Sequence, residues 1–190
     1  MVWISQREGS AADFERPAEE NAAPSTGAAP RAVTRTDVQR ISQKLVGRWV
    51  KDQAQSDRMD EAASLMQLNW VTRKAVRLIN GLEIAISEDV FTLTVLSVIP
   101  WFKVVESYPM NGSEKKHRRR DLRLGDVRGN LVLSAQDDSA ELTLHWGKPI
   151  SGSETSSFVL HNDKLTVTSK LDLDENKGSC MYTLVYNRVV

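Results

Sequence analysis

The chain has 190 residues, of which 41% are hydrophobic, so it can form one domain with a substantial core. Its 25 basic and 25 acidic residues give a formal net charge of +0, which argues against a dedicated nucleic-acid-binding protein. The single cysteine, Cys180, excludes an internal disulfide and suits a reducing compartment. No apolar run approaches a secretory signal or the ~18 apolar residues of a membrane span. We therefore expect a soluble cytoplasmic protein.

The first 36 residues differ in composition from the remainder. Residues 9–35 are rich in Ala, Pro, Glu, Ser and Thr, and Phe14 is their only aromatic residue. Such a stretch buries too little apolar surface to offset its ordering entropy, so residues 1–36 are predicted to be an extended, low-complexity N-terminal tail. Trp3 and Ile4 are candidate apolar anchors for a protein partner. Residues 37–190 are predicted to form a single β-barrel.

Helical segments are predicted on both sides of the first strand, which spans 46–52. Asp37 can cap a short helix. Its apolar positions, spaced to share one face, are Val38, Ile41 and Leu45. After the strand, residues 56–80 are predicted to form a helix-turn-helix, in which Asn69 can cap the second helix.

About nine strands are predicted after the helices, separated by turn signals such as Asn111-Gly112 and Asn162-Asp163. The predicted ranges are 82–87, 90–98, 102–108, 115–124, 127–136, 140–146, 154–160, 165–171 and 179–189. Consecutive hairpins make a meander, and closing it removes the exposed edges. We therefore predict an all-β fold, a ten-stranded up-and-down antiparallel β-barrel with a helix-turn-helix lid. Such a barrel either encloses one small ligand or is filled by side chains.

This arrangement resembles the intracellular lipid-binding proteins, the cytosolic fatty-acid-binding group of the calycin superfamily. The similar stretches are Gly47-Arg48-Trp49 on the first strand, Trp70-Val71-Thr72-Arg73-Lys74 on the second lid helix, and Tyr186-Asn187-Arg188-Val189 at the end. The resemblance covers residues 44–189. It implies a slightly open barrel, with the helical pair as a lid over the lumen and Trp49 buried at the barrel floor.

The resemblance also implies a ligand site. The family usually binds a fatty-acid carboxylate with two arginines and a tyrosine; here Tyr186 matches the tyrosine, but Leu184 and Phe158 replace the arginines. An apolar side chain cannot stabilise a buried carboxylate, so we expect a neutral hydrophobic ligand. Tyr182 shares the face of Leu184 and Tyr186 and joins the expected ligand-binding residues. The alternative is a filled core in which Tyr186 hydrogen-bonds to backbone.

The second lid helix predicts contact with a membrane. Arg73, Lys74 and Arg77 form a basic face next to Trp70 and Val71. Such a face can contact an anionic membrane surface while the apolar residues reach the lipid boundary. The alternative is an ordinary solvated helix.

The densest charge run in the chain is Lys115-Lys116-His117-Arg118-Arg119-Arg120. On a strand, Lys116, Arg118 and Arg120 would face the same way, since side chains alternate. They are therefore candidate contacts for an acidic membrane or an acidic protein partner. The alternative is a solvated strand face.

No motif predicts catalysis, a metal site or a cofactor. His117, His145 and His161 lack metal-ligand spacing, and no phosphate-binding loop or nucleophile motif occurs. Two functions follow as hypotheses. The first is a non-enzymatic carrier of a small hydrophobic molecule. The second is a structural adaptor in a cytoskeletal or axonemal assembly, with the barrel as a rigid module and the tail as a strap.

Overall fold

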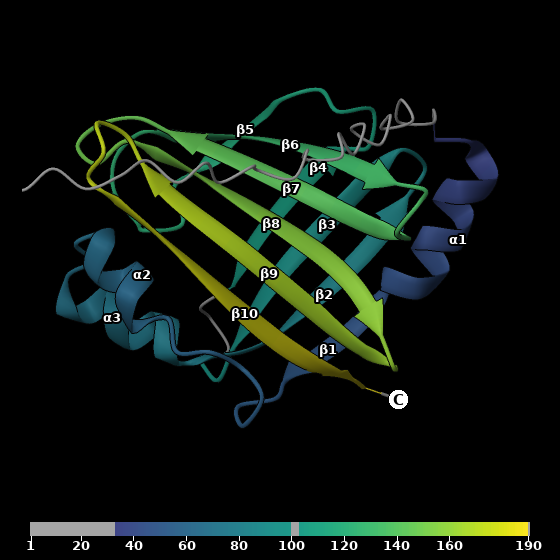
Figure 1. Cartoon of the computed structure of the whole chain (residues 1–190), viewed down its shortest axis with the longest axis horizontal. Helices are drawn as coiled ribbons and strands as arrows, with labels where there is room; N and C mark the ends of the chain where they lie inside the picture. The colour runs from purple at the N-terminus through teal and green to yellow at the C-terminus, as the bar shows by residue number, and fades with distance from the viewer. Residues whose placement is uncertain (1–32, 100–102, 190) are drawn as a thin grey trace, which may run out of the picture. The chain divides into compact units, whose positions relative to one another are not determined.

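The computed structural model of the chain describes residues 33–99 and 103–189 (Figure 1). The helices of this part are α1 (Arg35–Leu45), α2 (Asp60–Leu65) and α3 (Trp70–Arg77). The strands are β1 (Gly47–Lys51), β2 (Ile79–Ser87), β3 (Val90–Ser97), β4 (Val104–Pro109), β5 (Lys115–Arg118), β6 (Asp126–Ser134), β7 (Ser139–Trp146), β8 (Gly152–His161), β9 (Lys164–Leu173) and β10 (Gly178–Arg188). Trp3, Ile4 and most of the predicted tail lie outside the described residues.

The strands form one antiparallel sheet in the order β4-β3-β2-β1-β10-β9-β8-β7-β6-β5. Every neighbouring pair consists of strands that are consecutive in the chain, except β1 and β10, whose ladder brings the first strand beside the last. The two lid helices separate β1 from β2, and the other consecutive pairs are hairpins. Within the described residues β4 and β5 share no ladder, so the barrel is open along one side. The predicted ten-stranded up-and-down barrel with a helical lid is confirmed, with α1 as an additional helix.

Alternation of buried and exposed positions builds the core. On β7, Ala140, Leu142 and Leu144 are buried while Glu141 is exposed. This period of two places every second side chain inside the barrel. Trp49 of β1 is fully buried, as the resemblance implied, and its Nε1 donates to the Leu45 carbonyl oxygen at 3.0 Å.

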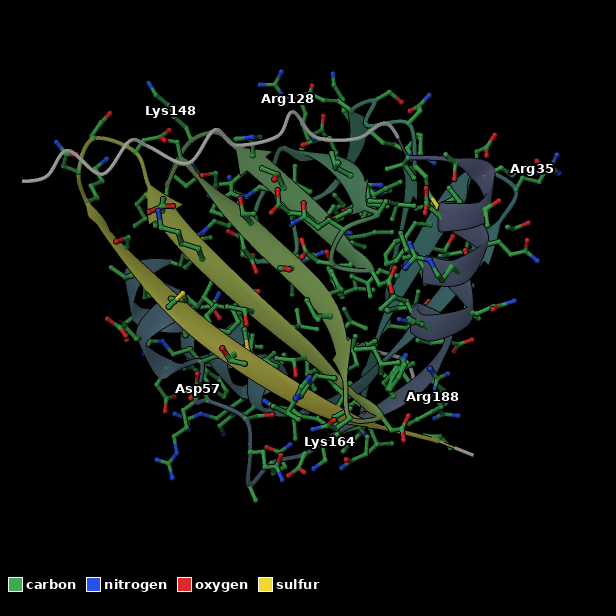
Figure 2. All side chains as sticks on the ribbon, turned by 45° about the vertical axis from the view of Figure 1, so that its right-hand side comes forward. Arg35, Asp57, Arg128, Lys148, Lys164 and Arg188 are labelled. Atoms are coloured by element: carbon green, nitrogen blue, oxygen red, sulfur yellow. The ribbon has the colours of Figure 1, made fainter. Side chains whose placement is uncertain are left out.

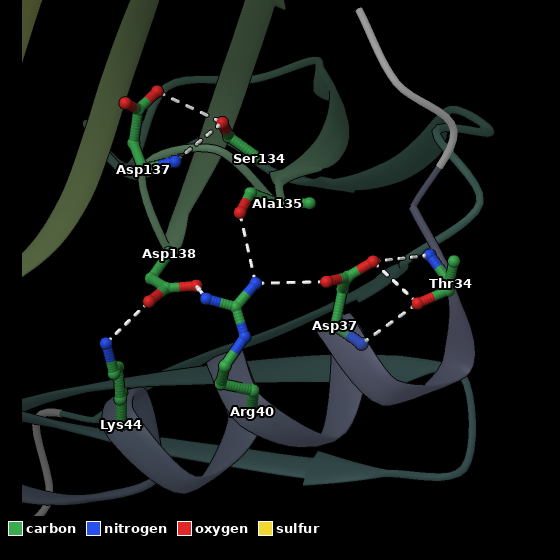
Figure 3. A network of polar contacts seen from close by, with 8 residues as sticks. All are labelled: Thr34, Asp37, Arg40, Lys44, Ser134, Ala135, Asp137 and Asp138. Carbon is green, nitrogen blue, oxygen red and sulfur yellow. Dashed lines mark hydrogen bonds and ion pairs between the residues drawn. The ribbon is translucent and has the colours of Figure 1, made fainter.

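Helix α1 lies at one end of the barrel, and α2 and α3 lie at the other (Figure 1). Thr34, rather than Asp37, is the N-cap of α1. Asp37 is the third residue of this helix and completes a capping box with Thr34. The predicted apolar face is confirmed, since Ile41 and Leu45 are fully buried. Arg40 and Lys44 form ion pairs with Asp138 in the β6–β7 turn (Figure 3).

Further contacts join α1 and the start of β1 to β10. Arg188, labelled in Figure 2, donates to the carbonyl oxygens of Lys44 and Val46. Its guanidinium also lies over the Trp49 ring, 4.2 Å from the centroid. Because α1 precedes β1 directly, these contacts fix the start of the barrel against its last strand.

Several predicted boundaries are wrong, most of them by one or two residues. Larger differences are in the lid, where the first helix begins at Asp60 instead of residue 56 and the second ends at Arg77, and in β2, which begins at Ile79 instead of residue 82. At Gly81, β2 approaches β1 closely. A Cβ at Gly81 would lie 2.4 Å from the Trp49 carbonyl oxygen. β5 ends at Arg118 instead of residue 124, and the chain then turns through Leu122 and Gly125, both at positive φ.

None of the helices in the described part of the chain is long and apolar enough to span a membrane.

Candidate functional site

A cavity of about 220 Å³ lies between the lid helices and the barrel strands. Its wall is largely apolar, with the lid supplying residues such as Met59, Ala62 and Met66. The lumen is therefore not filled by side chains.

The residues predicted to contact a ligand all line this cavity: Phe158, Tyr182, Leu184 and Tyr186. Alternation on β8 turns Phe158 inward, and alternation on β10 does the same for the other three residues. The structure thus brings these four residues together, and their contact with a ligand remains a prediction.

Tyr186 has a free hydroxyl. Among the described residues it forms no hydrogen bond, so the alternative in which it bonds to the backbone is wrong. Burial raises the pKa of Tyr186, so the group stays a neutral phenol. It can donate one hydrogen bond into the cavity and accept another.

Arg120 lines the cavity and was missed as a lumen residue. Its Nε lies 3.0 Å from Glu106 Oε1 and its Nη2 lies 2.5 Å from Oε2, which is a bidentate pair. Tyr108 donates its hydroxyl hydrogen to the same carboxylate at 2.8 Å. Burial alone would raise the pKa of Glu106, but Arg120 and Tyr108 outweigh burial and hold it below its usual value.

These contacts correct the predicted basic strip. Because β5 ends at Arg118, Arg120 does not share a strand face with Lys116 and Arg118. Lys116 and Arg118 are exposed, whereas Arg120 points to Glu106 inside the barrel. The sequence offers no local signal for this, since Glu106 lies on another strand.

Another cation of the cavity wall was also missed. Lys51, on β1 two residues after Trp49, lines the cavity, and burial lowers its pKa. It forms no ion pair with any described residue. The alternation that predicts Trp49 as buried also places Lys51 inside, so this residue could have been found from the sequence.

Two further charged residues of the wall bind each other. Arg119 Nη2 lies 2.7 Å from Asp121 Oδ2, and its Nη1 donates to the Gly147 carbonyl oxygen at 2.6 Å. Burial would raise the pKa of Asp121, but Arg119 and the Arg123 backbone hold it below its usual value. Arg123 in turn donates to the carbonyl oxygen of Gln67 at 2.8 Å, which ties this segment to the turn between α2 and α3.

The lid exposes two apolar residues of α3. The exposed fractions are 68% for Trp70 and 53% for Val71. Lys74 lies beside them, with its Nζ 4.8 Å from the centroid of the Trp70 ring. Helix α3 therefore presents apolar and cationic side chains next to each other on its surface.

Arg73 and Arg77 join the two lid helices. Arg77 forms an ion pair of 2.8 Å with Asp60 of α2. Arg73 donates to the Leu68 carbonyl oxygen at 2.8 Å and to the Ser64 hydroxyl at 3.3 Å. Of the predicted basic face, Arg77 forms an ion pair and Arg73 is held by hydrogen bonds, whereas Lys74 has neither kind of partner in the described part of the chain.

Solved structures with the same fold carry lipid-binding names. Apo Caenorhabditis elegans lipid binding protein 8 matches with a TM-score of 0.63 and 16% identity, over 84% of this chain and 100% of that chain. Echinococcus granulosus fatty-acid-binding protein 1 matches with a TM-score of 0.60 and 15% identity, over 78% and 99% of the two chains. Human cRBP IV matches with a TM-score of 0.56 and 17% identity, over 76% and 98%.

No model of a known protein family and no curated protein matches the sequence. The chain has the fold of the intracellular lipid-binding proteins, as the sequence resemblance predicted.

Proposed function

We propose that this barrel is a non-enzymatic, cytoplasmic carrier that reversibly binds a small hydrophobic, neutral molecule in its lumen. The observation that carries the proposal is the largely apolar cavity beneath a helical lid. Such cavities bind small molecules by burying their apolar surface, with a few polar groups setting orientation. The fold is shared with a lipid binding protein and a fatty-acid-binding protein, which supports a hydrophobic ligand.

The polar groups of the wall support a neutral ligand over a carboxylate. Leu184 and Phe158 occupy the positions that the resemblance assigns to carboxylate-binding arginines. Arg120 is already held by Glu106 at both carboxylate oxygens. To bind Arg120, a ligand carboxylate would have to displace Glu106, which is only 2% exposed, and leave its charge buried without a cation. Lys51 then remains as the cation of the wall that a carboxylate could meet, and burial lowers its pKa, which favours its neutral form.

Filling the cavity tests the proposal. Leu184→Trp places a large side chain in the lumen, whereas Met181→Trp places the same side chain on the outer face of β10, where Met181 is 70% exposed. Uptake of a neutral fluorescent dye such as Nile red should be lost in the first variant and kept in the second. Equal dye binding by both variants would show that the dye does not occupy the lumen and would contradict the proposal.

The alternative function, a structural adaptor in a cytoskeletal or axonemal assembly, draws on Lys116 and Arg118, which β5 exposes. Its proposed tail anchors, Trp3 and Ile4, lie outside the described residues. Two linked weak contacts bind far more tightly than either alone through effective concentration. Deleting residues 1–32 should then release the protein from a cellular assembly without unfolding the barrel, as fractionation and thermal melting would measure. Equal release of the truncated and the full-length protein contradicts this alternative.

A further inference from the structure

Glu154 is a carboxylate in the cavity wall that no cation contacts. Alternation on β8 turns Glu154, Ser156 and Phe158 toward the lumen. Asp121, the other acidic residue of the wall, is paired with Arg119. Within the described part of the chain, Glu154 forms no ion pair. It therefore differs from every acidic side chain around it.

The hydrogen bonds of Glu154 reach only one of its two oxygens. Tyr182 donates its hydroxyl hydrogen to Oε1 at 2.7 Å, and Ser156 donates to the same oxygen at 3.4 Å. Ser156 and Ser169 share a further hydrogen bond of 2.8 Å, which extends this polar cluster along the wall. Oε2 accepts no hydrogen bond from any described residue. A carboxylate offers about four lone-pair sites, so half of this acceptor capacity is unused.

The neighbouring cation does not fill this role. Arg120 uses Nε and Nη2 for Glu106, so its fork faces that carboxylate. Its charge interacts with Glu154 only at longer range. Because Arg120 is paired with Glu106, it offers Glu154 no direct contact.

We propose that Glu154 is the polar recognition residue of the lumen, and that the ligand's polar end is a hydrogen-bond donor, a hydroxyl or an amine, bound by Oε2. This inference rests on the proposed carrier function and narrows its ligand class. A donor would occupy the unused oxygen of this half-buried acceptor, which a bound ligand would otherwise cover without giving it a hydrogen bond. A ligand carboxylate would meet a like charge there, and an ether has no proton to donate.

Four probes of eight or nine carbons separate these chemistries: 1-octanol, octylamine, octyl methyl ether and octanoate. Each competes with Nile red for the full-length protein. We expect octanol and octylamine to bind about tenfold or more tightly than the ether and octanoate, the gain of a hydrogen bond to a charged acceptor. The comparison of octanol with octylamine tells a neutral donor from a charged one.

Variants of Glu154 assign the preference to this residue. Glu154→Gln keeps one oxygen for Tyr182 and replaces Oε2 with an NH2 group. The octanol oxygen can accept from this group but an ammonium cannot, so octanol binding should change by about twofold or less while octylamine weakens. In Glu154→Leu, the affinity for octanol should fall to the affinity for the ether. Glu141→Gln removes an exposed carboxylate from β7 and should change nothing. Melting curves identify any variant that does not fold, in which case Glu154→Gln decides through octylamine.

Three results overturn the inference. If Glu154→Leu binds octanol as tightly as the wild type, Glu154 is not the acceptor. If octanoate binds most tightly and Lys51→Met removes that binding, Lys51 is the recognition residue and the ligand is anionic. If the ether and octanol bind equally tightly, the carrier function stands, and only the inference that the ligand carries a hydrogen-bond donor is wrong. Failure of the dye and all four probes to bind instead contradicts the carrier function itself.

Discussion

The Arg120 guanidinium and the Glu106 carboxylate meet across the side of the barrel where β4 and β5 form no ladder. Close to this pair, His117 Nε2 lies 3.0 Å from the Ser107 carbonyl oxygen, and its ring packs edge-on against Tyr108 at 4.9 Å. These contacts all link β4 with β5 or with the segment that follows it. Side chains therefore take the place of backbone hydrogen bonds at this gap.

Arg120→Leu should destabilise the fold by about 3 kcal/mol or more, because it leaves Glu106 buried without its cation. Urea unfolding measures the loss. Arg118→Leu removes the same charge from an exposed position of β5 and should cost about 0.5 kcal/mol or less. A double variant with Glu106→Leu should recover part of the loss, since replacing both partners removes the unpaired charge. Equal effects of the two single variants would contradict a structural role for the pair.

The same pair predicts acid sensitivity. The pKa of Glu106 lies below its usual value of 4.5, so its pairing stabilises the fold above that pH, and the stabilisation is lost as the pH falls through the lowered pKa. Urea midpoints measured between pH 7 and pH 3 should fall for the wild type. In Arg120→Leu, burial raises the pKa of Glu106, so its stability should fall less on acidification. Arg118→Leu should follow the wild-type curve; a parallel curve for Arg120→Leu would exclude this origin.

The lid is predicted to contact anionic membranes through Trp70, Val71 and Lys74. Replacing both apolar residues with Ser should reduce co-sedimentation with anionic vesicles by removing buried apolar area. Lys74→Glu should reduce it further, since each basic residue near such a surface contributes about 1 kcal/mol. Val132→Ser changes an exposed apolar residue of β6 and serves as the control. A wild-type protein that never co-sediments contradicts membrane contact.

Helix α1 allows burial and ion pairing to be compared within a single helix. Ile41→Ala should cost about 2–5 kcal/mol, because it empties a fully buried site. Asp138→Asn breaks the pairs with Arg40 and Lys44 but should cost only about 1 kcal/mol or less, because both cations are more than 40% exposed. Asparagine tolerates the positive φ of this position, so no strain is added. Thermal melting measures both, and a larger effect of Asp138→Asn would reverse this order.

The strands were predictable because their alternation and turn residues are local. The predicted inward set on β10, Tyr182, Leu184 and Tyr186, is buried as expected. The end of β5 was not predictable in this way. Arg119 and Arg120 continue a run of basic residues that resembles a solvated strand, but each has a carboxylate partner inside the protein. For Arg120 that partner is distant in the sequence and becomes a neighbour only when the barrel closes.

The polar side of the lumen was missed for a different reason. Lys51 and Glu154 have the same parity as Trp49 and Phe158, so the alternation that identified the apolar residues also places these charges inside. Charged residues on strands are usually assigned to the outer face, because burying a charge is costly. This cost is smaller for a residue of the lumen wall, because its charged group faces a cavity and not tightly packed apolar side chains.

The ladder between β1 and β10 also determines when the barrel can form during folding. Every other ladder joins strands that follow each other in the chain, whereas Arg188 and Lys44, which meet at this seam, are 144 positions apart. Local hairpins form quickly, but contacts between distant residues require the intervening chain to be ordered first. A nascent chain that lacks β10 would hold two separate sheets, one from β4 to β1 and one from β9 to β5, and their free edges make such a form prone to aggregate. The capacity to enclose a ligand therefore arises only with the synthesis of the last strand.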